Sequence, residues 1–229
     1  DRSPWPALLR EGVNSIVSRV NVPRAKRTES LMHWVPFCLA RHQLHLARLK
    51  VPGAEEESIL LDFGNEATPL RRRSQKDLSD FRNDIVNAVN AQAKEMIAEA
   101  EGDERKVLRY EKFTRDNGTA VTSPRGFFTE TMAAIGALNA PVGRRHFTMK
   151  PPMLEALVSA TIPHDAEMEF GQFCALLYRK YRIVVEDKVA INDPLAYDVD
   201  TSLLRSNGVA FKDRLTAIGL LTQYSDATS

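Results

Sequence analysis

The sequence predicts a mostly α-helical protein that contains one long central helix. Apolar residues recur every three or four positions along most of the chain, a spacing typical of helices that bury one face. Strand-like runs are few and short. The 229 residues are 43% apolar and 27% charged, the composition of an ordinary globular protein that can bury a sizeable core.

Two helices and one strand-like run are expected before residue 64. Ser3 and Pro4 suit the cap and first position of a helix that residues 21–23 should end. Its apolar face is Leu8, Leu9, Val13, Ile16, Val17 and Val20. A second helix is expected from residue 28 to about residue 49, and Pro36 should kink or split it. Its core side is Leu31, Trp34, Val35, Cys38, Leu39 and Leu46. Residues 58–63 form either a strand or a buried extended connector.

The longest helix is expected over residues 75–100. Ser74 suits its N-cap, and Asp77 stands at the third helical position, as in a variant capping box. Residues 103–125 are polar and contain the turn sequence 116–118, so we expect a domain boundary or a mobile loop there. The sequence therefore predicts a helical domain at residues 1–122 and a second domain at residues 123–229.

The second domain is expected to alternate helices with two short strands. Helices are predicted from Ser123 to near residue 139, from residue 151 to 158, and from residue 165 or 167 to Tyr181. A short strand at residues 183–185 and a polar stretch follow. A final helix, capped by Thr201 or Ser206, should end at Gly219 and lead into a strand at residues 220–224.

The order of these elements resembles a winged helix-turn-helix domain over about residues 150–229, although no specific family is identified. The segment NGVAFKDRLTAIGLLTQY, residues 207–224, has the pattern of a recognition helix followed by the first wing strand. The resemblance implies that the final helix enters the major groove of DNA while the wing touches the backbone or the minor groove. The residues expected to contact DNA on this basis are Arg205, Asn207, Lys212, Thr216 and Gln223.

Basic residues are clustered although the formal net charge is only +1. A small net charge can hide a locally positive face. Arg144, Arg145 and Lys150 precede the winged-helix-like segment, so we expect them to form an auxiliary phosphate-binding site. The run of residues 71–73 has two interpretations, a phosphate contact or a surface that pairs with acidic neighbours.

No pattern of catalytic or cofactor-binding residues is present. His33, His42 and His45 lie near Cys38, but zinc needs four ligands at recognisable spacing and no second cluster follows. Asp62 and Glu66 could begin a metal-dependent nuclease site, yet the acidic-x-lysine pair that should follow on another strand is missing. We therefore expect neither a metal, a cofactor nor an enzyme activity.

The remaining features concern the cellular compartment of the protein and the extent of its chain. Cys38 and Cys174 occur in apolar, helix-like surroundings, which favours buried thiols in a reducing compartment. No apolar run reaches the roughly 18 residues of a membrane span, and no signal peptide is present, so a cytoplasmic protein is expected. The chain ends where a wing hairpin should return, which suggests a fragment of a larger bacterial-type protein.

Three functions follow from these patterns. The first is a non-enzymatic module that binds double-stranded DNA through the C-terminal winged helix. The second is a helical scaffold that docks other protein subunits through the same surfaces. The third, an enzyme built around Asp62 and Glu66, depends on a metal site for which the sequence offers only two of the ligands.

Overall fold

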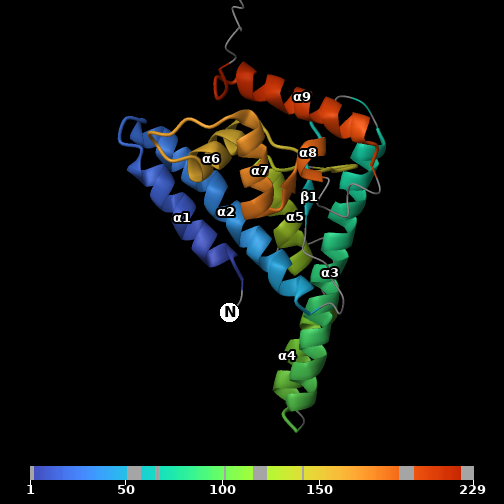
Figure 1. Ribbon diagram of the computed structural model, residues 1–229. Helices are drawn as coiled ribbons and strands as arrows, with labels where there is room; N and C mark the ends of the chain where they lie inside the picture. Colours follow the sequence, from blue (N-terminus) through green and yellow to red (C-terminus); the bar gives the residue numbers. More distant parts are fainter. Residues whose placement is uncertain are drawn as a thin grey trace, which may run out of the picture.

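The structure of the protein, a computed structural model, describes residues 3–50, 58–64, 66, 68–100, 102–115, 123–140, 142–190 and 199–222. Within these residues the chain forms nine helices and two strands of two residues each (Figure 1). The expected class, a mostly α-helical protein, is confirmed.

Helix α1 (Trp5–Ser18) lies at one edge of the molecule and packs on α2 (Arg24–Arg48), which runs through the middle and also packs on helices from later parts of the chain (Figure 1). Helix α2 begins four residues earlier than expected, and Pro36 does not split it. The predicted apolar faces are only partly right. Val20 lies beyond the end of α1 and is 75% exposed, and Leu39 and Leu46 also face solvent. The residues that α2 buries most completely are Trp34, Phe37, Cys38, Ala40, Arg41 and Leu44.

The long helix α3 (Pro69–Glu99) was correctly expected, but its start was not. Thr68 is the N-cap, and its side chain accepts a hydrogen bond from the backbone N–H of Arg71. Pro69 occupies the first helical position, where its fixed φ and missing N–H cost nothing. The capping role predicted for Ser74 is therefore wrong, because Ser74 lies inside the helix and is fully buried.

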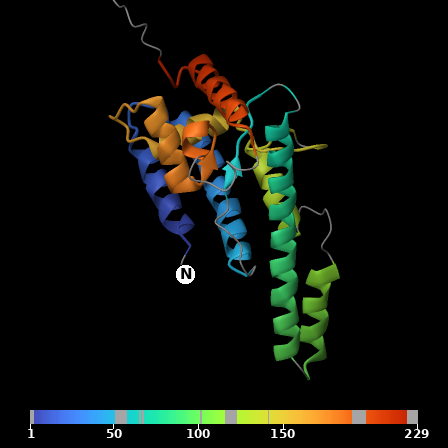
Figure 2. The same ribbon diagram turned by 45° about the vertical axis from the view of Figure 1, so that its right-hand side comes forward.

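Helix α4 (Glu104–Arg115) corrects the prediction of a loop over residues 103–125. It packs against the C-terminal half of α3, and the two helices extend beyond the rest of the molecule as a projecting arm (Figures 1 and 2). Asp103 caps α4, since its carboxylate accepts from the backbone N–H of Lys106 at 3.2 Å. An arm with solvent on most sides needs few apolar residues, which explains its polar sequence. The turn expected at residues 116–118 lies outside the described residues.

Two short strands connect distant parts of the sequence. Strand β1 (Ile59–Leu60) pairs in parallel with β2 (Ile183–Val184), with Ile59 opposite Ile183 and Leu60 opposite Val184. All four side chains are buried. Of the two alternatives for residues 58–63, a strand forms at Ile59 and Leu60, and the short strand expected at residues 183–185 is confirmed at Ile183 and Val184. Strand β2 pairs with the N-terminal half of the chain and not with a wing.

The remaining helices are α5 (Pro124–Ala134), α6 (Pro151–Thr161), α7 (Phe170–Tyr181), α8 (Asp187–Ala190) and α9 (Thr201–Ala217). Ser123 caps α5 as expected, because its hydroxyl accepts from the N–H of Gly126. Helix α5 ends at Ala134, five residues before the predicted end, and the short helix α8 was not expected. Asp200 caps α9 in place of Thr201 or Ser206.

The described residues after α9 do not form the first wing strand that was expected there. Gly219 adopts a left-handed φ of +74° and ends the helix as predicted. Residues 220–222 form no strand, and residues 223–224 lie outside the described part of the chain. The winged-helix interpretation therefore stays a prediction.

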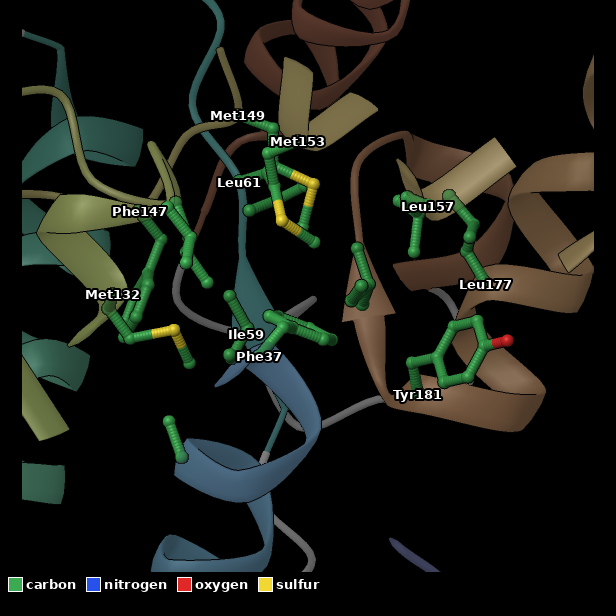
Figure 3. Close-up of a cluster of buried hydrophobic side chains, with 14 of the residues drawn as sticks. Phe37, Ile59, Leu61, Met132, Phe147, Met149, Met153, Leu157, Leu177 and Tyr181 are labelled. Carbon is green, nitrogen blue, oxygen red and sulfur yellow. The ribbon is translucent and has the colours of Figure 1, made fainter. Parts of the chain in front are cut away.

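Two clusters of buried apolar side chains surround the strand pair, a large one and a small one of Leu60, Leu70, Val184, Ala190, Val199 and Leu204. The large cluster is the main core. In the close-up of Figure 3, Ile59 and Leu61 lie between Phe37 on one side and Met149 and Met153 on another. The core also includes Trp5 from α1 and Phe211 from α9. Because it contains side chains from both sides of residue 122, the predicted domain boundary does not divide it.

Candidate nucleic-acid interface

A cavity of about 480 Å³ lies between α3, α5 and the loop that precedes Phe147. Four arginines line it, and we call it the arginine pocket. One acidic residue, Glu130, is also present. The complete lining is Gln75, Leu78, Ser79, Arg82, Arg125, Gly126, Thr129, Glu130, Val142, Gly143, Arg144 and Arg145.

Two helices supply the facing walls of the pocket. On α3, Gln75, Ser79 and Arg82 are spaced i, i+4 and i+7, so they share one face of the helix. On α5, Arg125 and Thr129 are spaced i, i+4 near the N-terminus of the helix. The first turn of a helix carries a partial positive charge, which adds to that of the arginines.

The third wall is a hairpin loop with a well-anchored base. The backbone N–H of His146 donates to the side-chain oxygen of Asn139 at 2.8 Å, and the N–H of Asn139 donates back to the carbonyl of His146 at 3.2 Å. Leu138 and Phe147 form an antiparallel bridge directly below. Arg144 and Arg145 therefore project from a short loop whose two ends are fixed to each other.

Buried hydrogen bonds attach this hairpin to α3 and to β1. The Ser74 hydroxyl accepts from the N–H of Phe147 at 3.0 Å and donates to the carbonyl of Leu60 at 2.8 Å. The carbonyl of Phe147 accepts from the N–H of Asp62 at 2.9 Å. The loop, α3 and the strand thus form one connected unit, so the backbone that carries Arg82, Arg144 and Arg145 is fixed.

The charges in the arginine pocket are unbalanced. Arg145 pairs with Glu130, with 2.9 Å between the Nη1 and Oε1 atoms. The Nε atoms of Arg82 and Arg125 are buried and have no hydrogen-bond partner within the described residues. Burial lowers the pKa of Arg82 below its usual value, and the positive charges of Arg125 and Arg145 lower it further. Beyond the Arg145–Glu130 pair three further arginines line the cavity, so its net positive charge favours an anionic ligand.

The structure brings only two of the predicted site residues together. Arg144 and Arg145 both line the arginine pocket. Lys150 is exposed at the N-cap position of α6 and does not line the pocket. Gln223 lies outside the described residues.

The predicted contacts on α9 divide into exposed and buried residues. Lys212 is exposed, Arg205 is exposed and pairs with Asp187 at 3.2 Å, and Thr216 is half-buried. The prediction that Asn207 contacts DNA is wrong, because its side chain is buried and only 4% exposed. Its side chain accepts from the N–H of Phe63 and donates to the carbonyls of Leu61 and Val185, at distances of 2.8, 2.8 and 2.7 Å. Its amide therefore secures α9 to the strand region and cannot reach DNA.

The other clusters singled out in the sequence serve the fold. Arg71 donates to Asp62 at 2.6 Å, and Arg73 donates to Asp77 at 2.8 Å. The run of arginines at residues 71–73 thus supports the second interpretation, pairing with acidic neighbours. Asp62 is buried in that ion pair, and Glu66 is exposed.

The histidines near Cys38 also make local contacts. His33 lies 2.8 Å from the carbonyl of Glu29, and His42 lies 2.8 Å from the hydroxyl of Ser3. Across the described ranges, no group of three or more His, Cys, Asp or Glu side chains could hold a metal ion. Burial raises the pKa of both cysteine thiols well above the usual range, as expected of packed, unreactive side chains.

Sequence reasoning missed Arg82 and Arg125. Each stands on a helix whose apolar positions dominate the pattern, and neither belongs to a run of basic residues. The available signal was the polar stripe Gln75, Ser79 and Arg82 on the long helix. That stripe shows that α3 has a polar face, but it does not show that this face packs beside α5.

Comparison of the chain with protein-family models, with curated proteins and with solved structures gave no significant match. In the part of the chain that the structure describes, no helix has the length and apolar character needed to cross a membrane.

Proposed function

We propose that the protein is a non-enzymatic DNA-binding module that holds phosphate groups of the DNA in the arginine pocket. The observation that carries the proposal is the presence of four arginines with one carboxylate in a single cavity. Guanidinium groups bind phosphate oxygens through paired, charge-assisted hydrogen bonds, and they recognise phosphate more specifically than ammonium groups do.

The winged-helix resemblance supplies a second contact surface on α9. Arg205 and Lys212 are exposed on this helix, and buried Asn207 fixes the opposite face to the core. In this proposal α9 presents its outer face to the duplex while the arginine pocket anchors the backbone. Phosphate contacts set the affinity and the position, and contacts from α9 to the base edges set any sequence preference.

The test measures duplex binding as a function of salt for wild-type protein and two matched double variants. Arg125→Gln/Arg144→Gln removes two pocket charges. Arg105→Gln/Arg109→Gln removes two exposed charges from α4, outside the arginine pocket. If each pocket arginine neutralises one phosphate, the pocket variant should reduce the slope of log affinity against log salt by about 2, and the α4 variant should leave it nearly unchanged. Equal losses in both variants, or no binding by the wild type, would refute the proposal.

The scaffold function remains the second candidate because of an apolar groove between α2 and α3. This groove has a volume of about 420 Å³, and Leu49 at its edge is 60% exposed. Its other apolar lining residues are Leu46, Ala47, Ile85, Ala88 and Val89. A chain that binds no duplex at low salt, yet loses a protein complex on Leu46→Glu substitution, would favour this function.

A further inference from the structure

We infer that the group held in the arginine pocket is a terminal phosphate, the phosphomonoester at the end of a DNA strand. The inference rests on the proposed function and names the part of the DNA that the pocket recognises. An internal phosphodiester is the alternative that the geometry disfavours.

The shape of the site is the first argument. Helices α3 and α5 and the hairpin loop wall the pocket on three sides, and its volume of about 480 Å³ is that of a small-molecule site. Proteins that follow an uninterrupted strand use an open positive groove that tracks successive phosphates. A pocket between two helices instead suits a group that projects from the end of a chain.

The amount of charge is the second argument. Four arginines and Glu130 leave an excess of three positive charges in the pocket. A phosphomonoester carries about −1.5 to −2 at pH 7 and presents three strong acceptor oxygens. An internal diester carries a single negative charge and has two free oxygens. A monoester at one position therefore neutralises more of the excess positive charge than a diester does. It can also accept hydrogen bonds from more of the guanidinium groups.

The identity of the donors is the third argument. Arg82 stands on α3 and Arg125 stands on α5, so guanidinium groups line the pocket from both helical walls. Arg144 adds an exposed guanidinium from the loop. A three-oxygen group placed between the walls can accept from both helices at once.

The lining of the pocket also indicates that it does not recognise a DNA base. It contains no aromatic side chain among its described residues. Proteins that recognise unpaired bases usually stack them on aromatic rings. The pocket therefore selects the phosphate and not the base attached to it, so end binding should be independent of sequence.

The experiment compares one duplex in four forms with wild-type protein at a fixed salt concentration. The forms carry a 5′-phosphate, a 3′-phosphate or only hydroxyl ends, and the fourth is a covalently closed dumbbell without ends. Fluorescence anisotropy gives each dissociation constant. One of the two phosphorylated duplexes should bind about tenfold or more tightly than the hydroxyl and dumbbell forms, because a charged hydrogen-bonding group is added.

Variants of the pocket arginines test whether the preference for a phosphorylated end arises in the arginine pocket. Arg144→Gln and Arg125→Gln should each reduce the preference for the phosphorylated end, and Arg125→Lys should keep the charge but lose part of the preference, since it cannot donate in a fork. Arg105→Gln on α4 is the control and should keep the full preference. Because Arg144 is exposed, its replacement tests the pocket even if the Arg125 variants fold poorly.

The outcomes separate this inference from the proposed function. Equal affinity for all four duplexes, weakened in each case by the pocket variants, would overturn the terminal-phosphate inference and leave DNA binding intact. Absence of binding to every duplex would overturn both. Tight binding of a phosphoserine peptide without any duplex binding would assign the pocket to a different class of partner and would also overturn both.

Discussion

The hydroxyl of Ser74 and the backbone N–H of Phe147 form a buried hydrogen bond of 3.0 Å across 73 positions of sequence. The same hydroxyl donates to the carbonyl of Leu60. One small side chain therefore satisfies two buried backbone groups and joins α3, β1 and the hairpin that carries Arg144 and Arg145.

Replacement of Ser74 should affect both stability and binding. Ser74→Ala leaves the Phe147 N–H and the Leu60 carbonyl without this partner, so we expect a loss of about 1–3 kcal/mol in the free energy of unfolding. Urea denaturation measures it. Duplex affinity should also fall, because the hairpin is held less firmly. Ser206→Ala, at an exposed position of α9, is the control and should change stability by less than about 0.5 kcal/mol.

Asn207 should be one of the most sensitive polar positions in the protein. Asn207→Ala removes three buried hydrogen bonds to backbone groups, which predicts a loss of about 2–4 kcal/mol by chemical denaturation. Asn207→Asp should be no better, since a carboxylate would face the carbonyls of Leu61 and Val185. The exposed Asn14→Ala is the control. A mild Asn207→Ala phenotype would show that water replaces these bonds.

Two glycine-to-alanine substitutions should have opposite signs. A Cβ atom at Gly12 would lie 2.2 Å from the indole Nε1 of Trp34, a fully buried side chain. We expect Gly12→Ala to cost about 1–3 kcal/mol from overpacking, which outweighs its better helix propensity. At Gly171 on α7 a Cβ atom meets nothing within 4 Å, so Gly171→Ala should raise stability by up to about 1 kcal/mol. Thermal unfolding decides the signs, and a rise in Tm for both variants would contradict the close packing at Gly12.

His146 should make stability depend on pH below neutrality. Burial lowers its pKa in the folded protein, with Asp62 opposing the shift and Arg71 adding to it. The unfolded state then binds a proton at a higher pH than the folded state does. Stability conferred by neutral His146 is therefore complete above the unfolded pKa of about 6.5 and falls as the pH drops below it, with a slope of at most about 1.4 kcal/mol per pH unit.

The comparison that isolates this effect uses His146→Gln. Denaturation curves between pH 7.5 and 5.0 should fall more steeply for the wild type than for the variant. His42, whose pKa is also lowered by burial, contributes to both curves and cancels in the difference. Parallel curves would mean that His146 titrates normally.

Much of the fold could be predicted from local pattern. The apolar residues of α6 and α7 recur with a clear helical period. The run that contains β2 was predicted as a strand, and for the run that contains β1 a strand was one of two alternatives. The errors have physical causes. Serine is a common N-cap residue, so Ser74 was a reasonable candidate. Thr68 and Pro69 precede it in the sequence and begin the helix earlier. Residues 104–115 are mostly polar and charged because they belong to an arm, so only a few apolar residues marked the helix there.

The site was less predictable than the fold. Arg144 and Arg145 are adjacent in sequence and were identified, whereas Arg82 and Arg125 join them only through the packing of α3 against α5. Asn207 was predicted to contact DNA because of the winged-helix resemblance. Its spacing of i, i+4 and i+8 with Phe211 and Leu215 places it on the buried face, and that spacing was a better guide than the resemblance.

The parallel pairing of β1 with β2 has a consequence for synthesis on the ribosome. Ile59 and Leu60 emerge about 120 residues before the partners that will cover them, which corresponds to roughly 6–24 s of translation. During that interval the nascent chain displays an unpaired apolar edge of the kind that promotes aggregation. Chaperones that cover apolar segments of nascent chains should therefore matter more for the yield of this protein than for helical bundles whose packing partners are adjacent in sequence.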